Sequence, residues 1–155
     1  MSTVRLLVAS FSNTQDPVLH SWLVHRSRVL GEVQYGKSLE GSDGFNPEEH
    51  IFVWRLLTSN NRELARSAAV FKKFSEAKKD AVEAQESIHT WVHHSVVDAD
   101  QGTHTWLASA ANSPKALGAR WFRMERDRDK ALQSALTAFA AASLPESAHA
   151  AGLRR

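Results

Sequence analysis

The chain has 155 residues, of which 43% are hydrophobic and 23% charged, a balance typical of a folded globular protein and not of a disordered one. It contains no cysteine, which excludes disulfides, thiol nucleophiles and thiolate metal ligands and favours a cytoplasmic location. The first residues lack the pattern of a signal peptide, and no apolar run reaches the roughly 18 residues of a membrane span. We therefore expect a protein that is neither exported nor embedded in a membrane.

The N-terminal residues 1–28 are predicted to form a β-hairpin extension. Two short runs, residues 4–10 and 19–26, have the apolar or alternating pattern of strands, and "NTQDP" between them holds turn-forming residues. A further alternating run at 29–35 predicts another strand. The segment that follows, 36–50, is rich in glycine and acidic residues and is predicted to be a flexible loop.

Residues 51–71 show the pattern of an antiparallel hairpin followed by a helix. Phe52, Trp54 and Leu56 fall on one face of an extended chain, "TSNNRE" supplies a polar turn, and "LARSAAVF" returns as the second strand. A helix is expected over 75–87, with Ser75 as its N-cap. Its apolar positions recur at helical spacing, at Ala77, Ala81, Ala84 and Ile88.

The C-terminal third repeats this plan, with a strand at 88–97, a hairpin at 104–122 and a helix after it. The offset stays between 50 and 53 residues, so that Trp54 matches Trp106, Phe71 matches Phe122, and Ala81-Val82 matches Ala131-Leu132. We predict an α+β fold made of two tandem β-β-β-α repeats, with both helices on one face of an antiparallel sheet. The repeats are expected to span 29–88 and 89–142, and a disordered tail is expected at 143–155.

The first repeat resembles the YegP-like family, small bacterial proteins of uncharacterised function. The resemblance lies in an aromatic-x-Trp-Arg-Leu strand, a polar turn with Asn, a return strand with Ala-x-Ser, an aromatic residue and a helix. The matching positions are Phe52, Trp54, Arg55, Leu56, Asn61, Ala65, Ser67, Phe71 and Ala77. The resemblance covers roughly residues 29–141, and in the second repeat Leu107 replaces the Arg that follows Trp. It implies the duplicated fold and brings no established activity.

A second, weaker resemblance is to DNA-binding domains that place a three-stranded sheet in the major groove, which implies nucleic acid as a partner. Residues 55–80 carry seven basic and three acidic side chains, a local excess that suits phosphate contacts. The candidate nucleic-acid-binding residues are Arg55, Arg62, Arg66, Lys72 and Lys73. The competing interpretation, an ordinary solvated charged face, is favoured by the way soluble helices and hairpins display Lys and Arg.

Histidines and nucleophiles give little reason to expect metal chemistry or catalysis. His89 and His93 are candidate metal ligands by their spacing of four, but the surrounding sequence lacks the frame of a known metal site, so no metal is predicted. The chain has no nucleophile elbow and no glycine-rich phosphate loop, and no cofactor is predicted. We expect a non-enzymatic interaction or structural module that binds a protein partner or itself, as a homodimer, through its sheet surface or edges. Nucleic-acid binding through the basic hairpin and helix start is the alternative.

Overall fold

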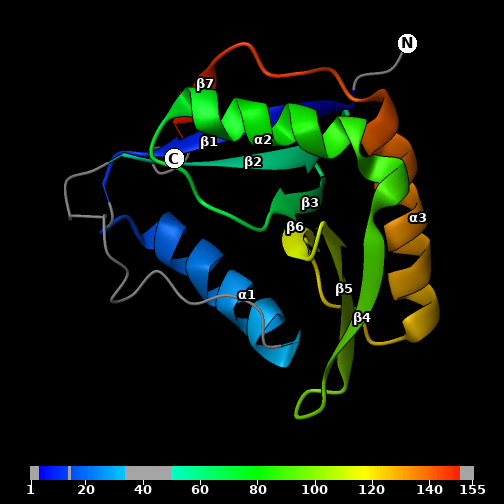
Figure 1. The fold of residues 1–155 in the computed structure, drawn as a ribbon. Coiled ribbons are helices and arrows are strands. Elements are labelled where there is room, and N and C mark those ends of the chain that lie inside the picture. Colours follow the sequence, from blue (N-terminus) through cyan, green and yellow to red (C-terminus); the bar gives the residue numbers. More distant parts are fainter. Residues whose placement is uncertain (1–3, 14, 34–49, 151–155) are drawn as a thin grey trace.

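The computed structural model describes residues 4–13, 15–33 and 50–150, which form an α+β fold around one mixed sheet (Figure 1). In chain order the elements are β1 (Arg5–Phe11), α1 (Pro17–Val33), β2 (Ile51–Leu57), β3 (Glu63–Ser67), α2 (Phe74–Glu86), the short 3-10 helix η1 (Ile88–Thr90), β4 (Val92–Asp98), β5 (Thr103–Ala110), β6 (Ser113–Gly118), α3 (Glu125–Ala141) and β7 (Ala148–Ala150). The α+β class predicted from the sequence is confirmed.

The strands form one sheet in the order β4-β5-β6-β3-β2-β1-β7. Neighbouring strands are antiparallel except β1 and β7, which pair in parallel, so the prediction of a purely antiparallel sheet is wrong. The two predicted hairpins, β2-β3 and β5-β6, meet at the centre, where Ala65 of β3 pairs with Gly118 of β6. Burial of apolar side chains on both sides of this central seam makes it the middle of the core.

The predicted N-terminal hairpin is absent from the described residues, because 17–33 form the helix α1. The strand predicted at 19–26 and the described part, 29–33, of the strand predicted at 29–35 are therefore wrong. Asp16 caps this helix: its Oδ1 accepts the backbone N–H of Val18 over 2.8 Å, and Pro17 occupies the first helical position, where a proline fits well. The buried side chains recur at helical spacing, at Leu19, Trp22, Val29 and Leu30. Strand β1 pairs with β2 instead of with a hairpin partner.

Other boundaries agree more closely. The first predicted helix, 75–87, is α2, and the predicted strand at 88–97 is η1 followed by β4. The predicted disordered tail is wrong for 148–150, because these residues form β7, whose backbone is paired with that of β1. The predicted flexible loop at 36–50 lies outside the described residues except for His50.

Three groups of buried apolar side chains form the core. The largest includes residues of α2, α3 and the strands, and in it the ring of Phe139 packs edge-on against Trp54 and Trp91, with 5.2 Å between ring centroids in each pair. Leu19 and Trp22 of α1 pack with β1 and β2 residues in the second group, and Val29 and Leu30 pack with β4, β5 and β6 residues in the third. Helix α1 thus lies across several strands of the sheet.

Polar contacts fix α1 to the sheet along its length. Arg26 Nε donates to the backbone oxygen of Ala68 over 2.5 Å, and His25 Nε2 lies 2.9 Å from the carbonyl oxygen of Gly118, to which it donates. Arg28 is paired with Asp98 at the end of β4, and its guanidinium lies 4.2 Å from the centroid of the Trp121 ring. Among the described residues, no helix is both long and apolar enough to cross a membrane.

Candidate functional site

Two of the five predicted nucleic-acid-binding residues are already committed to an acidic partner. Arg55 and Arg66 are paired across β2 and β3, and Glu63 lies 3.2 Å from Arg55 Nε and 2.8 Å from Arg66 Nε. The guanidinium of Arg66 also stacks 4.4 Å from the ring centroid of Trp22 on α1. Both guanidinium groups are therefore held by contacts within the fold, and Glu63 offsets one of their two positive charges.

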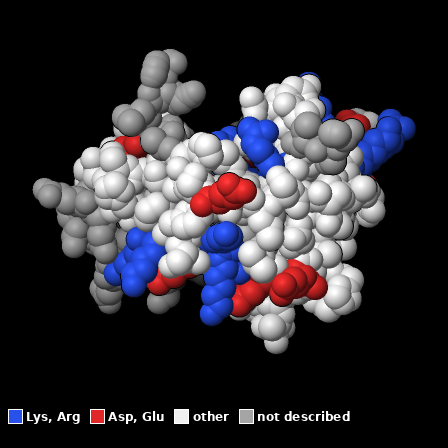
Figure 2. Space-filling view, turned by 90° about the horizontal axis from the view of Figure 1, so that it is seen from above, with Lys and Arg blue, Asp and Glu red and all other residues white. Residues whose placement is uncertain are grey.

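The other three predicted residues are exposed but lie in two places. Arg62 lies in the turn between β2 and β3, whereas Lys72 and Lys73 come immediately before α2. Figure 2, the view from above onto the face that carries α2, shows basic and acidic side chains interspersed over the described surface. The structure thus brings Arg55 and Arg66 together through Glu63 and leaves Arg62 apart from the lysine pair.

The two histidines named as metal candidates are also exposed. His89 belongs to η1 and His93 to β4, so a bend in the chain separates them. Within 4–13, 15–33 and 50–150 no group of three or more His, Asp or Glu side chains could hold a metal ion.

One buried polar bridge joins α2 to the sheet. The indole N–H of Trp54 donates to Asp80 Oδ2 over 2.7 Å, and Lys115 Nζ of β6 donates to Asp80 Oδ1 over 2.8 Å. The side chains of Lys115 and Asp80 are only 18% and 16% exposed, so these charge-assisted bonds are partly shielded from water. Both oxygens of the carboxylate are therefore occupied by donors from two strands. We call this arrangement the Asp80 bridge.

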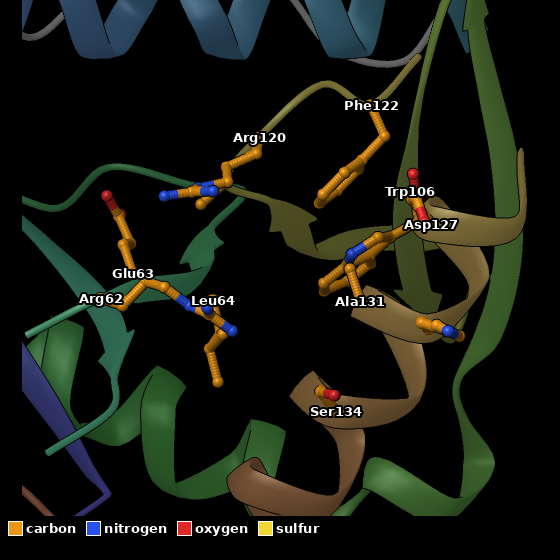
Figure 3. A pocket seen from close by; sticks show the side chains of 11 residues that line it. Arg62, Glu63, Leu64, Trp106, Arg120, Phe122, Asp127, Ala131 and Ser134 are labelled. Carbon is orange, nitrogen blue, oxygen red and sulfur yellow. The ribbon is translucent and has the colours of Figure 1, made fainter. Parts of the chain in front are cut away.

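A cavity of about 340 Å³ opens beside the second tryptophan, between β3, the segment before α3 and α3 itself (Figure 3). We call it the Trp106 cavity. Its apolar wall includes Leu64, Trp106 and Phe122. The charged residues that line it are Arg62, Arg120, Lys130, Glu63 and Asp127, and the small ones are Ala119, Ala131 and Ser134.

The Trp106 cavity is rich in hydrogen-bond donors that have no acceptor. Figure 3 shows the guanidinium groups of Arg62 and Arg120 and the indole nitrogen of Trp106 around the same space. In the described part of the chain, Arg62 forms hydrogen bonds only through its backbone, with Thr58, and the indole N–H of Trp106 has no hydrogen bond within the fold. Glu63 is bound to Arg55 and Arg66, which weakens its ability to neutralise Arg62. A site of this composition suits an acceptor from outside the fold.

Sequence reasoning identified Arg62 but did not identify this cavity. It assigned the matched tryptophans to the core, and Trp106 is indeed buried. One difference between the two helices could have indicated the cavity. The seventh residue of α2 is Asp80, whereas the seventh residue of α3 is Ala131.

Strand β4 forms one edge of the sheet. All seven of its residues pair with β5 without a bulge, and no further strand lies on its other side in the described residues. Val92 and Val97 are 57% and 44% exposed, large fractions for apolar side chains on a strand. The one acidic residue of β4, Asp98, is buried against Arg28, and the strand has no Lys, Arg or Pro. This edge therefore lacks the charges and prolines that commonly block strand pairing.

Comparison with solved structures finds a likeness to a protein of unknown function from E. coli, determined by solution NMR. The likeness covers 67% of this chain and 87% of that one, with a TM-score of 0.49 and 12% sequence identity. That protein is YegP. YegP belongs to the family that the first repeat resembles, and its function is unknown. No family model matches the chain, and no curated protein matches it.

Proposed function

We propose that the protein is a non-enzymatic interaction module that associates with a second copy of itself along the edge strand β4. The observation that carries this proposal is the regular seven-residue edge with exposed valines and no blocking charge. An edge strand presents a row of backbone N–H and C=O groups without hydrogen-bond partners. Antiparallel pairing with the same strand of a second copy, related by a two-fold axis, gives these groups their partners.

The side chains of β4 support pairing on both faces of the strand. Val92 and Val97 point to opposite faces, because successive residues of a strand alternate. Antiparallel pairing centred near Ser95 brings His93 of one copy close to Val97 of the other. The contact would bury apolar surface on each side of the extended sheet without bringing like charges together.

The test is the molar mass in solution as a function of concentration, measured by sedimentation velocity. We expect the unmodified protein to be dimeric at tens of micromolar and Val97→Lys to be monomeric. Val24→Lys is the matched control, because Val24 is also an exposed valine, 53% exposed, but belongs to α1 and not to the paired strand. A wild-type protein that stays monomeric up to millimolar concentration, or a Val97→Lys variant that dimerises as well as the control, would contradict the proposal.

Nucleic-acid binding stays the competing prediction, and it rests now on Arg62, Lys72 and Lys73. Binding through phosphates weakens steeply as the salt concentration rises, because counterions are released. A mobility-shift titration on DNA and RNA at low and moderate salt tests it. Loss of binding in a triple Arg62→Gln, Lys72→Gln, Lys73→Gln variant would support it, whereas a dissociation constant that does not change with salt would count against it.

The proposed module includes an internal duplication in which β1, and not the run at 29–35, is the first strand of the first repeat. The strand order supports this, since β6-β5-β4 and β3-β2-β1 run outward from the central seam in mirrored order. The isolated bridges Phe52 to Phe71 and His104 to Phe122 recur at matching places. Val53 and Trp54 are neighbours in β2 and therefore point to opposite faces of the sheet, and they belong to different core groups. This supports an arrangement with α1 on one face of the sheet and α2 and α3 on the other.

A further inference from the structure

The Asp80 bridge and the Trp106 cavity occupy corresponding places in the two hairpin-and-helix units. Trp54 and Trp106 are each the fourth residue of their strand. Lys115 and Arg62 each lie three residues before a member of the central pair, Gly118 and Ala65. Each place therefore has one tryptophan and one basic residue from the hairpin across the seam: Lys115 shares Asp80 with Trp54, and Arg62 lines the cavity with Trp106.

The two places differ in the residue that the helix supplies. In α2 the seventh residue is Asp80, whose carboxylate holds Trp54 and Lys115. In α3 the seventh residue is Ala131, which lines the Trp106 cavity. A methyl group replaces a carboxylate here, so the two donors that a carboxylate would hold, Trp106 N–H and the Arg62 guanidinium, face open space of about 340 Å³.

We propose that the Trp106 cavity binds a small organic carboxylate, whose carboxylate group takes the place that Asp80 fills in the other unit. One oxygen would accept the indole N–H of Trp106 and the other an N–H of the Arg62 guanidinium, which forms strong charge-assisted hydrogen bonds with a carboxylate. This inference does not depend on pairing through β4, because none of the cavity residues belongs to that strand.

The rest of the cavity defines the body of the ligand. Leu64, Phe122 and the Trp106 ring give an apolar wall that suits a flat or branched hydrocarbon group. The volume lies at the lower end of the range for small-molecule sites, about 300 to 1,000 Å³, and so favours a ligand about the size of one amino-acid residue.

The charge of the lining favours a monoanion. Arg62, Arg120 and Lys130 are opposed by Glu63 and Asp127, a formal net charge of +1 among the lining residues, and the pairing of Glu63 with Arg55 and Arg66 makes the surroundings of Arg62 more positive than this sum. A phosphate dianion would meet Asp127, which Figure 3 shows beside Trp106, with unfavourable repulsion. A single carboxylate balances the excess and leaves Asp127 able to accept a donor from the ligand body.

The experiment is a titration of ¹⁵N-labelled protein with sodium benzoate, followed by the indole N–H signals of the tryptophans, with Trp106→Phe used to assign the Trp106 signal. We expect benzoate to shift the Trp106 signal with a saturable, millimolar or tighter dissociation constant. Benzamide, a neutral molecule of the same shape, and inorganic phosphate should bind at least tenfold more weakly. N-acetylphenylalanine imitates the C-terminal residue of a peptide. Its affinity relative to that of benzoate shows whether the cavity prefers a peptide C-terminus or a small aromatic acid.

Three variants test the assignment of roles. Ala131→Asp restores the internal carboxylate, and we expect it to abolish benzoate binding while the protein stays folded. Arg62→Met should weaken binding at least tenfold, and Lys79→Met, which removes an exposed charge on α2, should leave it unchanged.

Several results would overturn the proposal. These are an unshifted Trp106 signal with both carboxylates, equal binding of benzamide and benzoate, or full benzoate binding by Ala131→Asp. If a variant fails to fold, the comparison of benzoate with benzamide on the unmodified protein decides the matter alone.

Discussion

Asp80 accepts the indole N–H of Trp54 over 2.7 Å, and through this one bond a residue in the middle of α2 is fixed to a residue in the middle of β2. The same carboxylate holds Lys115 of β6, so a single side chain connects three elements that are far apart in the sequence.

Replacing Asp80 should therefore lower the stability of the fold. We expect Asp80→Ala to reduce the free energy of unfolding by about 2 kcal/mol, because a hydrogen bond to a charged group contributes about 1.5 to 3 kcal/mol. Asp80→Asn, which keeps an acceptor for Trp54 but not the charge opposite Lys115, should cost less. Urea unfolding followed by circular dichroism measures both. Glu83→Gln on the exposed side of α2 is the control, and a loss from Asp80→Ala no larger than from that control would show that the bridge contributes nothing.

Gly118 should not tolerate a side chain. A Cβ at this position would lie 2.6 Å from Thr105 Oγ1 and 2.8 Å from Trp106 Nε1, closer than such atoms approach in folded proteins. We expect Gly118→Ala to destabilise the protein by about 1 to 3 kcal/mol, since overpacking forces side chains out of their preferred rotamers. The same urea experiment measures this. Gly31→Ala on α1 is the control, because a Cβ there meets nothing within 4 Å, and equal stabilities for the two variants would contradict the prediction.

His25 should make stability fall in mildly acidic solution. Burial lowers the pKa of His25 below its usual 6.5, and repulsion from Arg66 acts in the same direction, while the bond to the Gly118 oxygen opposes both. The unfolded chain then binds a proton more readily than the fold does, so the contribution of His25 is present above pH 6.5 and is lost as the pH falls toward its folded pKa.

Thermal unfolding between pH 7.5 and 5.5 tests this dependence. The melting temperature of the wild-type protein should fall over this range by more than that of His25→Gln, even if the variant is less stable at pH 7.5. His20→Gln, an exposed position on the same helix, should keep the wild-type slope. Parallel curves for the wild-type protein and His25→Gln would refute the role given to His25.

Asp98 should make the stability of the fold depend on pH in a more acidic range than His25 does. The hydrogen bonds from Arg28 lower the pKa of Asp98 below its usual 3.8, and the backbone N–H groups of Gln101 and Asp100 add to the effect. The carboxylate thus stabilises the fold above about pH 4, and this contribution is lost as the pH falls through the folded pKa. In an acid titration followed by tryptophan fluorescence, Asp98→Asn should be less stable than wild type at pH 7 and should lose less stability between pH 5 and 3. Equal losses in the two proteins would show that Asp98 is not responsible.

Patterns over a few residues predicted the two hairpins and their helices because each is a local structure. Phe52, Trp54 and Leu56 alternate as a pleated strand requires, and the predicted helix at 75–87 differs from α2 by one residue at each end. The prediction of strands within α1 is wrong because His, Ser and Arg alternate with apolar residues in short windows of this segment. The helical spacing of Leu19, Trp22 and Val29 and the Asp16-Pro17 start are visible only over the whole segment.

The candidate site could be predicted less well, because it depends on contacts across the sheet. The pairing of Arg55 with Arg66 brings the two arginines together, and a register shift after Leu56 pairs Leu57 with Glu63. No local pattern in the sequence reveals that shift. Similarly, Ala131 looks like an ordinary helical alanine. It becomes informative only when the first residues of α2 and α3 are aligned in space, which shifts it from the predicted match with Ala81 to Asp80.

The parallel pairing of β7 with β1 has a consequence for how large an assembly can become. It occupies the backbone of β1 on the side opposite β2 with a strand of only three residues, which offers a poor template to another chain. The described sheet therefore has two unlike ends, and contacts between identical ends close on themselves. A protein that pairs only through the edge strand β4 forms a dimer and no larger assembly. If both edge strands of the sheet could pair, copies would add without limit into a fibre.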